Sequence, residues 1–207
     1  MLSPLAQALL LVAAYLVGSL PFSYLIVKLR TGRDVRTVGS GNAGATNVTR
    51  AAGKAAGVLA ALLDVGKGIA VVLLARGLGA SAALVGGAAF AAVLGHCHPV
   101  FLRFRGGKGG ATGAGALAVL APPAAALSVL VLVLVIAWKR WVSLGTVTAA
   151  ASAPLFVLAF QRLGLLPVGE RILPATAAIA ALVAVRHHAN LRRLLAGTEP
   201  RVGSAKR

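Results

Sequence analysis

Acidic residues are scarce in this sequence: only four Asp and Glu occur among its 207 residues. Charged residues of both signs make up 12% of the chain, about half of the roughly 25% found in soluble domains. A single cysteine, Cys97, excludes an internal disulfide. His96 and His98 flank it, but adjacent side chains point in different directions and no carboxylate is near. We therefore expect no metal site and no cofactor.

Apolar residues fill most of the chain, with 58% hydrophobic residues and a mean hydropathy of +0.89. Runs of roughly 18 or more apolar residues indicate membrane spans. The run 5–27 has no basic residue before it, which favours a retained span over a signal peptide. We predict an all-α polytopic membrane protein forming one domain over 1–207, with Pro122-Pro123 separating two helices. The seven expected transmembrane helices cover 4–28, 55–75, 80–94, 111–121, 122–137, 141–160 and 173–185.

The basic residues are distributed unevenly over this seven-helix arrangement. One side receives 17 of the 21 Lys and Arg residues, and the other receives only Arg76, Arg162 and Arg171, with Lys67 inside a helix. Because Lys and Arg accumulate in cytoplasmic loops, we expect an outside N-terminus and a cytoplasmic C-terminus. The net charge of +17 therefore indicates membrane topology, and we expect no nucleic-acid partner because no basic, aromatic-rich domain is present.

The first polar segment on this face is GSGNAGATNVTR, residues 39–50. Its start matches the dinucleotide pattern G-x-G-x-x-G, but that pattern requires a preceding strand, and here a basic loop precedes it. Ser, Asn and Thr can donate neutral hydrogen bonds, and Arg50 can grip a phosphate with two N–H groups. A helix cap would explain one or two of these residues. The number of polar residues favours an anion site.

The second polar segment is FRGGKGGAT, residues 104–112. It is not a nucleotide-binding P-loop, because Lys108 is followed by Gly109 where that motif requires Ser or Thr. Glycines nevertheless allow backbone N–H groups to approach an anion, and a helix N-terminus follows. A flexible, positively charged loop is the alternative interpretation. We favour a second anion-binding segment.

Two further groups of polar residues need an explanation. Asp64 and Lys67 lie three residues apart on one helical face, and buried charges in a span are costly unless paired or functional. In RHHANLRRLLAGTE, residues 186–199, His187 and Asn190 share a helical face, although the segment also suits an amphipathic interfacial helix. No G-x-S-x-G motif is present, so a hydrolase-type nucleophile has no support.

Together, SGNAGATNVTR, GHCHPVFLRFRGGKGGAT and RHHANLRRLLAGTE resemble the three cytoplasmic motifs of the bacterial acyl-phosphate-dependent glycerol-3-phosphate acyltransferases, the PlsY type. LDVGKG, residues 63–68, also fits. The resemblance covers nearly the whole chain. It implies transfer of a fatty acyl group from acyl phosphate to the 1-hydroxyl of glycerol 3-phosphate. The products would be lysophosphatidic acid and phosphate, in the first step of phospholipid synthesis at the cytoplasmic face of the bacterial plasma membrane.

The resemblance also assigns expected roles to residues of this chain. The expected catalytic residues are Ser40, Arg50, Lys108, His187 and Asn190. The expected substrate-binding residues are Asn42, Gly44, Thr46, Asn47, His96, Gly106, Gly107, Gly109 and Thr112. Asp64, Lys67 and Glu199 are expected to have supporting roles. The protein is expected to be a monomer surrounded by membrane lipids.

Three questions stay open on the residues alone. The residues do not distinguish an acyl phosphate donor from acyl-CoA, and only the resemblance favours acyl phosphate. A transporter of a small anion is the alternative function. Transporters bind their substrate near the membrane midplane, whereas the polar residues of this chain gather at one side. The proton of the attacking hydroxyl has two possible acceptors, His187 and the phosphate of the acyl donor. A base at His187 would give an acidic limb in the pH–rate profile near the ordinary histidine pKa of ~6.5.

Overall fold

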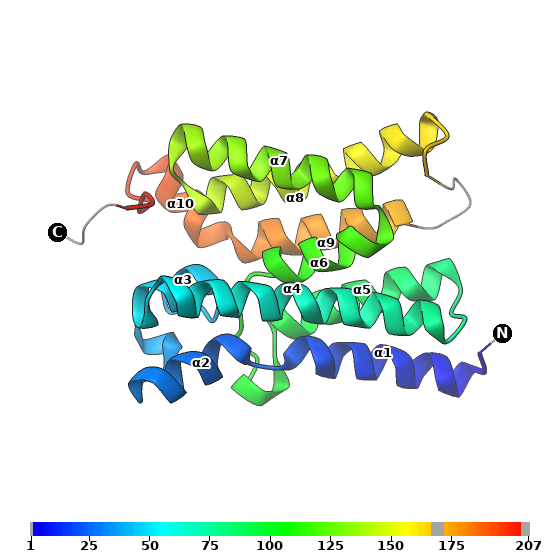
Figure 1. Ribbon diagram of the computed structural model, residues 1–207, viewed down its shortest axis with the longest axis horizontal. Coiled ribbons are helices and arrows are strands. Elements are labelled where there is room, and N and C mark those ends of the chain that lie inside the picture. Colours follow the sequence, from blue (N-terminus) through cyan, green and yellow to red (C-terminus); the bar gives the residue numbers. More distant parts are fainter. Residues whose placement is uncertain (1, 167–171, 204–207) are drawn as a thin grey trace.

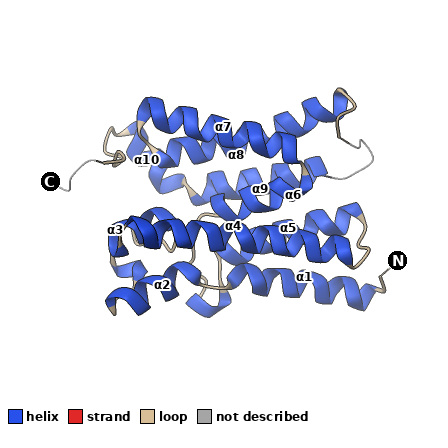
Figure 2. Ribbon diagram, in the orientation of Figure 1, coloured by secondary structure: helices blue, strands red, loops and turns tan. Residues whose placement is uncertain are grey.

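The structure is a computed structural model that describes residues 2–166 and 172–203. All regular structure in these ranges is helical (Figures 1 and 2). Arg171, Lys206 and Arg207, three of the basic residues counted above, lie outside them. The helices are α1 (Pro4–Ser19), α2 (Phe22–Thr31), α3 (Ala45–Ala52), α4 (Lys54–Gly77), α5 (Ala82–Cys97), α6 (Gly110–Leu120), α7 (Pro122–Lys139), α8 (Val142–Arg162), α9 (Ile172–Arg186) and α10 (His188–Leu195). Single 3₁₀ turns occupy Val35–Thr37 and Val100–Leu102.

Five segments are long and apolar enough to cross a membrane: Pro4–Thr31 and helices α4, α5, α7 and α8. The pair α9 and α10 becomes a sixth only if its 58° bend is counted within one span. Helix α6, with 11 residues, rises only about 16 Å. The all-helical membrane architecture is therefore confirmed, while the number seven rests on two short helices and stays a prediction.

The first expected helix, 4–28, is wrong in one respect: it is two helices. Helix α1 ends at Ser19 and α2 begins at Phe22, with Leu20 and Pro21 between them. Pro21 cannot donate a backbone hydrogen bond, and its ring disfavours a helical residue before it. The break leaves carbonyl groups near the end of α1 without helical hydrogen-bond donors. The side chain of Lys67 on α4 donates to them instead.

Glycine allows the helices to approach closely. A Cβ atom at Gly95 of α5 would collide with the backbone of α1 at Tyr15, and one at Gly115 of α6 would collide with Val65 of α4. Because lipid supplies no hydrophobic force between helices, such close backbone packing is a main source of association energy in membranes. It brings α1 onto α5 and α6 onto α4.

Helix α6 begins inside the bundle. Its first residue, Gly110, faces Thr146, four residues into α8, and the preceding Gly109 faces Val183, three residues before the end of α9. The loop that leads to it therefore enters the helical layer, and this allows so short a helix to complete the bundle. Helices α2, α3 and α10 lie at the opposite end of the long axis from the start of α1 (Figure 1).

Candidate functional site

The segment before α3 forms a tight loop over residues 38–44, here called the Ser40 loop. Gly39 and Gly41 adopt φ values of 58° and 68°, a left-handed conformation that glycine adopts without cost. Ser40 is exposed between them. The second half of the polar segment 39–50 belongs to helix α3, whose N-terminus has no side-chain cap at Gly44. Unpaired N–H groups at a helix start favour an anion.

Asn47 holds the Ser40 loop in shape. Its side chain is 1% exposed, and its amide donates to the carbonyls of Val35 and Val38, both at 2.8 Å. Its side-chain oxygen accepts from the backbone N–H of Ser40 at 3.0 Å. Because these bonds use both of its amide hydrogens and its oxygen, the geometry gives Asn47 a structural role beneath the loop, in place of the expected substrate contact.

Arg50 lies beside the same loop. Its Cδ would be 3.6 Å from a Cβ atom at Gly39, so its stem runs along the turn that exposes Ser40. The residue itself is exposed, as are Thr46 and Ser40, while Asn42 and Gly44 are half-buried. The expected phosphate-contacting residues of the first segment are therefore exposed or half-buried, apart from Asn47.

The loop before α6, residues 103–109, contains most of the second polar segment and is here called the Lys108 loop. It packs directly against the Ser40 loop. A Cβ atom at Gly107 would lie 2.9 Å from the carbonyl oxygen of Ala43 and would collide with the ring of His96. Gly106 is equally confined, by the carbonyl of His96 and by Pro99. These two glycines are thus required for close packing of protein on protein. Their expected second role, the approach of backbone N–H groups to an anion, stays a prediction.

The Lys108 side chain reaches the polar segment 186–199. Its Nζ donates to Oδ1 of Asn190 on α10 at 2.5 Å. The amide of Asn190 donates to Oε1 of Glu199 at 2.6 Å, and the hydroxyl of Ser143 donates to the same oxygen at 2.6 Å. The other oxygen of Glu199 accepts from Nε of Arg193 at 2.8 Å. Glu199 thus anchors Asn190, which in turn orients Lys108.

His187 occupies the turn between α9 and α10. It is buried, and its Nδ1 lies 2.7 Å from the carbonyl oxygen of Val183. Because a carbonyl can only accept, Nδ1 carries the proton and Nε2 keeps its lone pair. Burial lowers the pKa of His187 to about 4, and the nearby cations Lys108 and Arg186 also lower it. The hydrogen bond to the Val183 carbonyl and the negative charge of Glu199 act in the opposite direction. His187 is therefore neutral at neutral pH.

The site carries an excess of positive charge. Burial lowers the pKa of Lys108 to about 8; Glu199 opposes that change, while Arg193, Arg186 and Arg50 reinforce it. Burial acts to raise the pKa of Glu199, but hydrogen bonds from Ser143, Asn190 and Arg193 outweigh it and hold that pKa below its ordinary value. Four cations around one ionised carboxylate make a site complementary to a polyanion such as phosphate.

Arg186, Ser143 and Arg193 were missed as site residues by the sequence reasoning. Arg186 donates to the carbonyl of Gly107 from Nε at 3.2 Å and from Nη2 at 3.1 Å. In the sequence, Arg186 and Arg193 are two more basic residues on the cytoplasmic side, and Ser143 is one serine inside an apolar run. Their roles become visible only in the folded chain. There Arg186 contacts Gly107, 79 positions away, while Ser143 and Arg193 contact Glu199, 56 and 6 positions away.

The remaining expected residues lie beneath the site. Asp64 and Lys67 form the expected ion pair, with Nζ 3.0 Å from Oδ1. His96 joins them, with Nδ1 3.4 Å from the same oxygen. Gly109 takes a left-handed φ of 84° before α6. Thr112, in the first turn of α6, is fully buried, and its hydroxyl has no hydrogen-bond partner among the described residues.

Fold and site together define a helical membrane protein with a cationic, glycine-lined site at one end. Residues 8–197 match the family model described as glycerol-3-phosphate acyltransferase, and the chain belongs to this family. The glycerol-3-phosphate acyltransferase of Desulforamulus reducens is 39% identical over 98% of both chains. That of Aquifex aeolicus is 45% identical over 93% of this chain and 97% of its own.

Two crystal structures of PlsY (YgiH), an integral membrane glycerol 3-phosphate acyltransferase, have the same fold. The glycerol 3-phosphate form has a TM-score of 0.86 and 43% identity, covering 95% of this chain and 96% of that one. The lysophosphatidic acid form has a TM-score of 0.83 and 40% identity, covering 95% of each chain. The family expected from the three polar segments is therefore confirmed.

Proposed function

We propose that this chain transfers a fatty acyl group from acyl phosphate to the 1-hydroxyl of glycerol 3-phosphate, releasing lysophosphatidic acid and phosphate. The observation that carries the proposal is the convergence of Lys108, Arg50 and Arg186 on the Ser40 and Lys108 loops, around a buried neutral histidine. Both substrates are anionic, so one cationic surface can hold the two phosphate groups close together. Family membership supports the reaction and counts against the alternative of an anion transporter.

In this mechanism the protein supplies electrostatics and orientation. The hydroxyl oxygen of glycerol 3-phosphate attacks the acyl carbonyl carbon, and the bond from that carbon to the phosphate oxygen breaks. Negative charge grows on the carbonyl oxygen and then on the departing phosphate. Arg50, Lys108 and the N–H groups at the start of α3 stabilise this charge. Acyl phosphate is already activated, so the proposed reaction needs neither a covalent enzyme intermediate nor a cofactor.

His187 orients the attacking hydroxyl. Its Nε2 can accept a hydrogen bond from that group, while Val183 fixes the ring from the other side. With its pKa lowered to about 4, His187 binds a proton only weakly near neutral pH. It is therefore a poor general base, because a general base works best when its pKa is near the working pH. We therefore propose that the phosphate of the acyl donor takes the proton, the second of the two routes left open by the sequence.

The proposal includes a membrane arrangement. The end of the molecule that carries α2, α3 and α10 faces the cytoplasm of a bacterial plasma membrane, seven helices cross the bilayer, and the N-terminus lies outside. The distribution of Lys and Arg supports this orientation. The acyl chain lies among the helices, in or near lipid, while the phosphate groups stay at the polar end, and a monomer contains the whole site.

The test is a defined reaction of the purified protein in detergent with EDTA present. Glycerol 3-phosphate is combined with palmitoyl phosphate in one sample and palmitoyl-CoA in another, and products are identified by mass spectrometry. We expect lysophosphatidic acid from palmitoyl phosphate only, and none from a folded Lys108→Ala variant. Product from the thioester alone, or activity that EDTA abolishes and one added metal restores, would contradict the proposal.

A further inference from the structure

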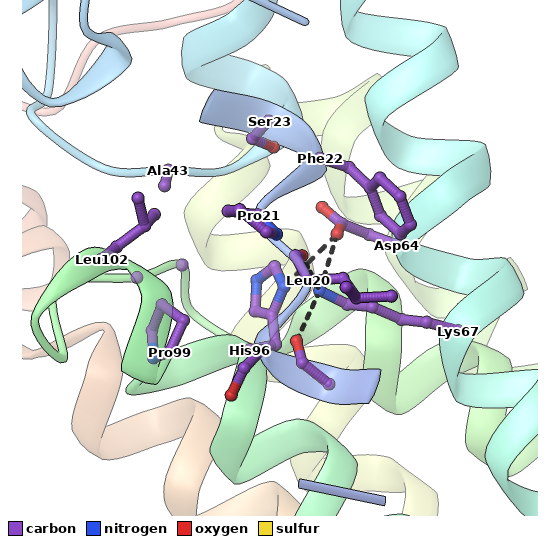
Figure 3. Close-up of a pocket in the computed structure, with 14 residues that line it drawn as sticks. Leu20, Pro21, Phe22, Ser23, Ala43, Asp64, Lys67, His96, Pro99 and Leu102 are labelled. Carbon is purple, nitrogen blue, oxygen red and sulfur yellow. Dashed lines mark hydrogen bonds and ion pairs between the residues drawn. The ribbon is translucent and has the colours of Figure 1, made fainter. Parts of the chain in front are cut away.

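A buried charged cluster lies directly beneath the Lys108 loop, at the break between α1 and α2. Asp64 and Lys67 project from α4 and His96 from α5; they are 2%, 5% and 7% exposed. Figure 3 shows the Asp64 carboxylate linked to both other side chains, on the wall of a small cavity that Ser23 and Ala43 also line. Buried charges are costly to maintain, so each contact of this cluster calls for an explanation.

Lys67 is explained by the broken helix. Its Nζ donates to the carbonyl of Gly18 at 2.8 Å and to that of Leu20 at 3.3 Å. These two carbonyls lie at the end of α1, where the break before Phe22 removes normal helical partners. Asp64 balances the ammonium charge at 3.0 Å. Lys67, balanced by Asp64, therefore satisfies the backbone carbonyls at the break. This role does not involve His96.

His96 gives Asp64 a second role, directed toward the site. Its Nδ1 lies 3.4 Å from Oδ1 of Asp64, so the carboxylate favours the tautomer with the proton on Nδ1. The opposite edge of the ring, with Nε2, lies where a Cβ atom of Gly107 would be. The backbone N–H of Gly107 also donates to the carbonyl of His96 at 3.0 Å. The loop thus rests on His96, and Asp64 fixes the ring.

Gly107 immediately precedes Lys108 and is held on two sides. His96 supports it from below, and Arg186 grips its carbonyl at 3.1 and 3.2 Å. Any tilt of the His96 ring would move this peptide, and with it the start of the Lys108 side chain that reaches Asn190. A continuous series of contacts therefore runs from Asp64 through His96 and Gly107 to the cation expected to bind phosphate.

We propose that Asp64 is a positioning residue of the transfer reaction: acting through His96, it sets the Lys108 loop at the height where Lys108 meets the phosphate of glycerol 3-phosphate. This inference rests on the proposed function and adds to it a residue far from the substrate surface. A purely structural ion pair would need no histidine between the carboxylate and the loop, because Lys67 alone satisfies the broken helix.

The test separates binding of glycerol 3-phosphate from folding. Asp64→Asn keeps the shape of the side chain and removes its charge, and His96→Asn removes the ring but leaves the pair of Asp64 and Lys67 intact. For both we expect the KM and the calorimetric Kd for glycerol 3-phosphate to rise about tenfold or more, since small displacements of catalytic groups have large effects. The KM for acyl phosphate should stay within about twofold because the loop change is local.

Two comparisons make the result specific. His98→Asn changes the neighbouring half-buried histidine, whose ring is not part of the cluster, and should leave both constants unchanged. In a Lys108→Ala background, Asp64→Asn should add little to the calorimetric Kd for glycerol 3-phosphate, because the two changes remove the same contribution. If Asp64→Asn fails to fold, as an unpaired buried Lys67 could cause, His96→Asn decides.

The outcomes are distinct. Folded variants with unchanged affinity for glycerol 3-phosphate, whether or not their unfolding temperature falls, would overturn the inference and leave the proposed function standing. Additive effects of Asp64→Asn and Lys108→Ala would also overturn it. A wild-type protein that neither binds nor acylates glycerol 3-phosphate would contradict the proposed function itself, and the inference with it.

Discussion

Lys108 and Asn190, 82 residues apart in the sequence, are joined by a hydrogen bond of 2.5 Å from Nζ to Oδ1. This bond connects the loop before α6 to the helix that follows α9. Glu199 continues the connection by accepting from Asn190 at 2.6 Å. The cation is therefore held in place before any substrate arrives, and preorganised charge is the main way in which an enzyme stabilises a transition state electrostatically.

The pKa of Lys108 predicts how activity depends on alkaline pH. Burial lowers this pKa to about 8, so Lys108 loses its charge as the pH rises through about 8 in the free enzyme. We expect kcat/KM for glycerol 3-phosphate to fall above that pH, because only the protonated amine attracts phosphate. In Lys108→Arg the guanidinium stays charged to pH ~12, so the limb should disappear even if the rate is lower. An unchanged limb in that variant would assign the titration to another group.

His187 predicts a different part of the pH profile. With a pKa of about 4, it gives no acidic limb near the ordinary value of ~6.5. A limb near pH 6 is instead expected from glycerol 3-phosphate, a phosphate monoester whose second pKa is about 6. We expect His187→Gln to lower kcat roughly tenfold or more through loss of the oriented hydrogen bond, while the limb near pH 6 persists. Disappearance of that limb in the variant would identify His187 as the general base.

Arg50 should not tolerate exchange for lysine. Both residues are cationic, but only arginine presents two parallel N–H donors to a phosphate. We expect Arg50→Lys to reduce kcat/KM roughly 10- to 100-fold, the equivalent of about 1.5–3 kcal/mol for hydrogen bonds to a charged group. The unfolding temperature in detergent should not change, because Arg50 is exposed. Rates equal to those of the wild type would leave Arg50 only a role in membrane topology.

Asn47 and Asn42 should behave oppositely when replaced by alanine. Asn47→Ala removes a buried side chain that bonds Val35, Val38 and Ser40, and we expect a loss of about 1–3 kcal/mol of stability, seen as a lower unfolding temperature. Asn42→Ala, at a half-buried position of the Ser40 loop, should keep the unfolding temperature and raise a substrate KM. A stable Asn47→Ala protein would show that these bonds matter little.

The sequence by itself determined the fold class and the set of polar segments. Long apolar runs predict helices in a membrane because lipid cannot satisfy an exposed backbone, and six of the seven expected ranges, all except 4–28, match single helices to within a few residues. The pairing of Asp64 with Lys67 also follows from spacing alone. Local physics fixes these features, since they depend on neighbouring residues and on the solvent.

Only the tertiary structure decided what each polar residue does. Gly107 is a glycine because His96 lies against it, and Asn47 is an asparagine because three backbone groups converge on it. The break before Phe22 is made tolerable by Lys67, 47 residues from the carbonyl of Leu20. Likewise, burial within the assembled bundle moves the pKa of His187 to about 4. Such roles depend on contacts between distant segments and on the exclusion of water, and neither exists until the helices have packed.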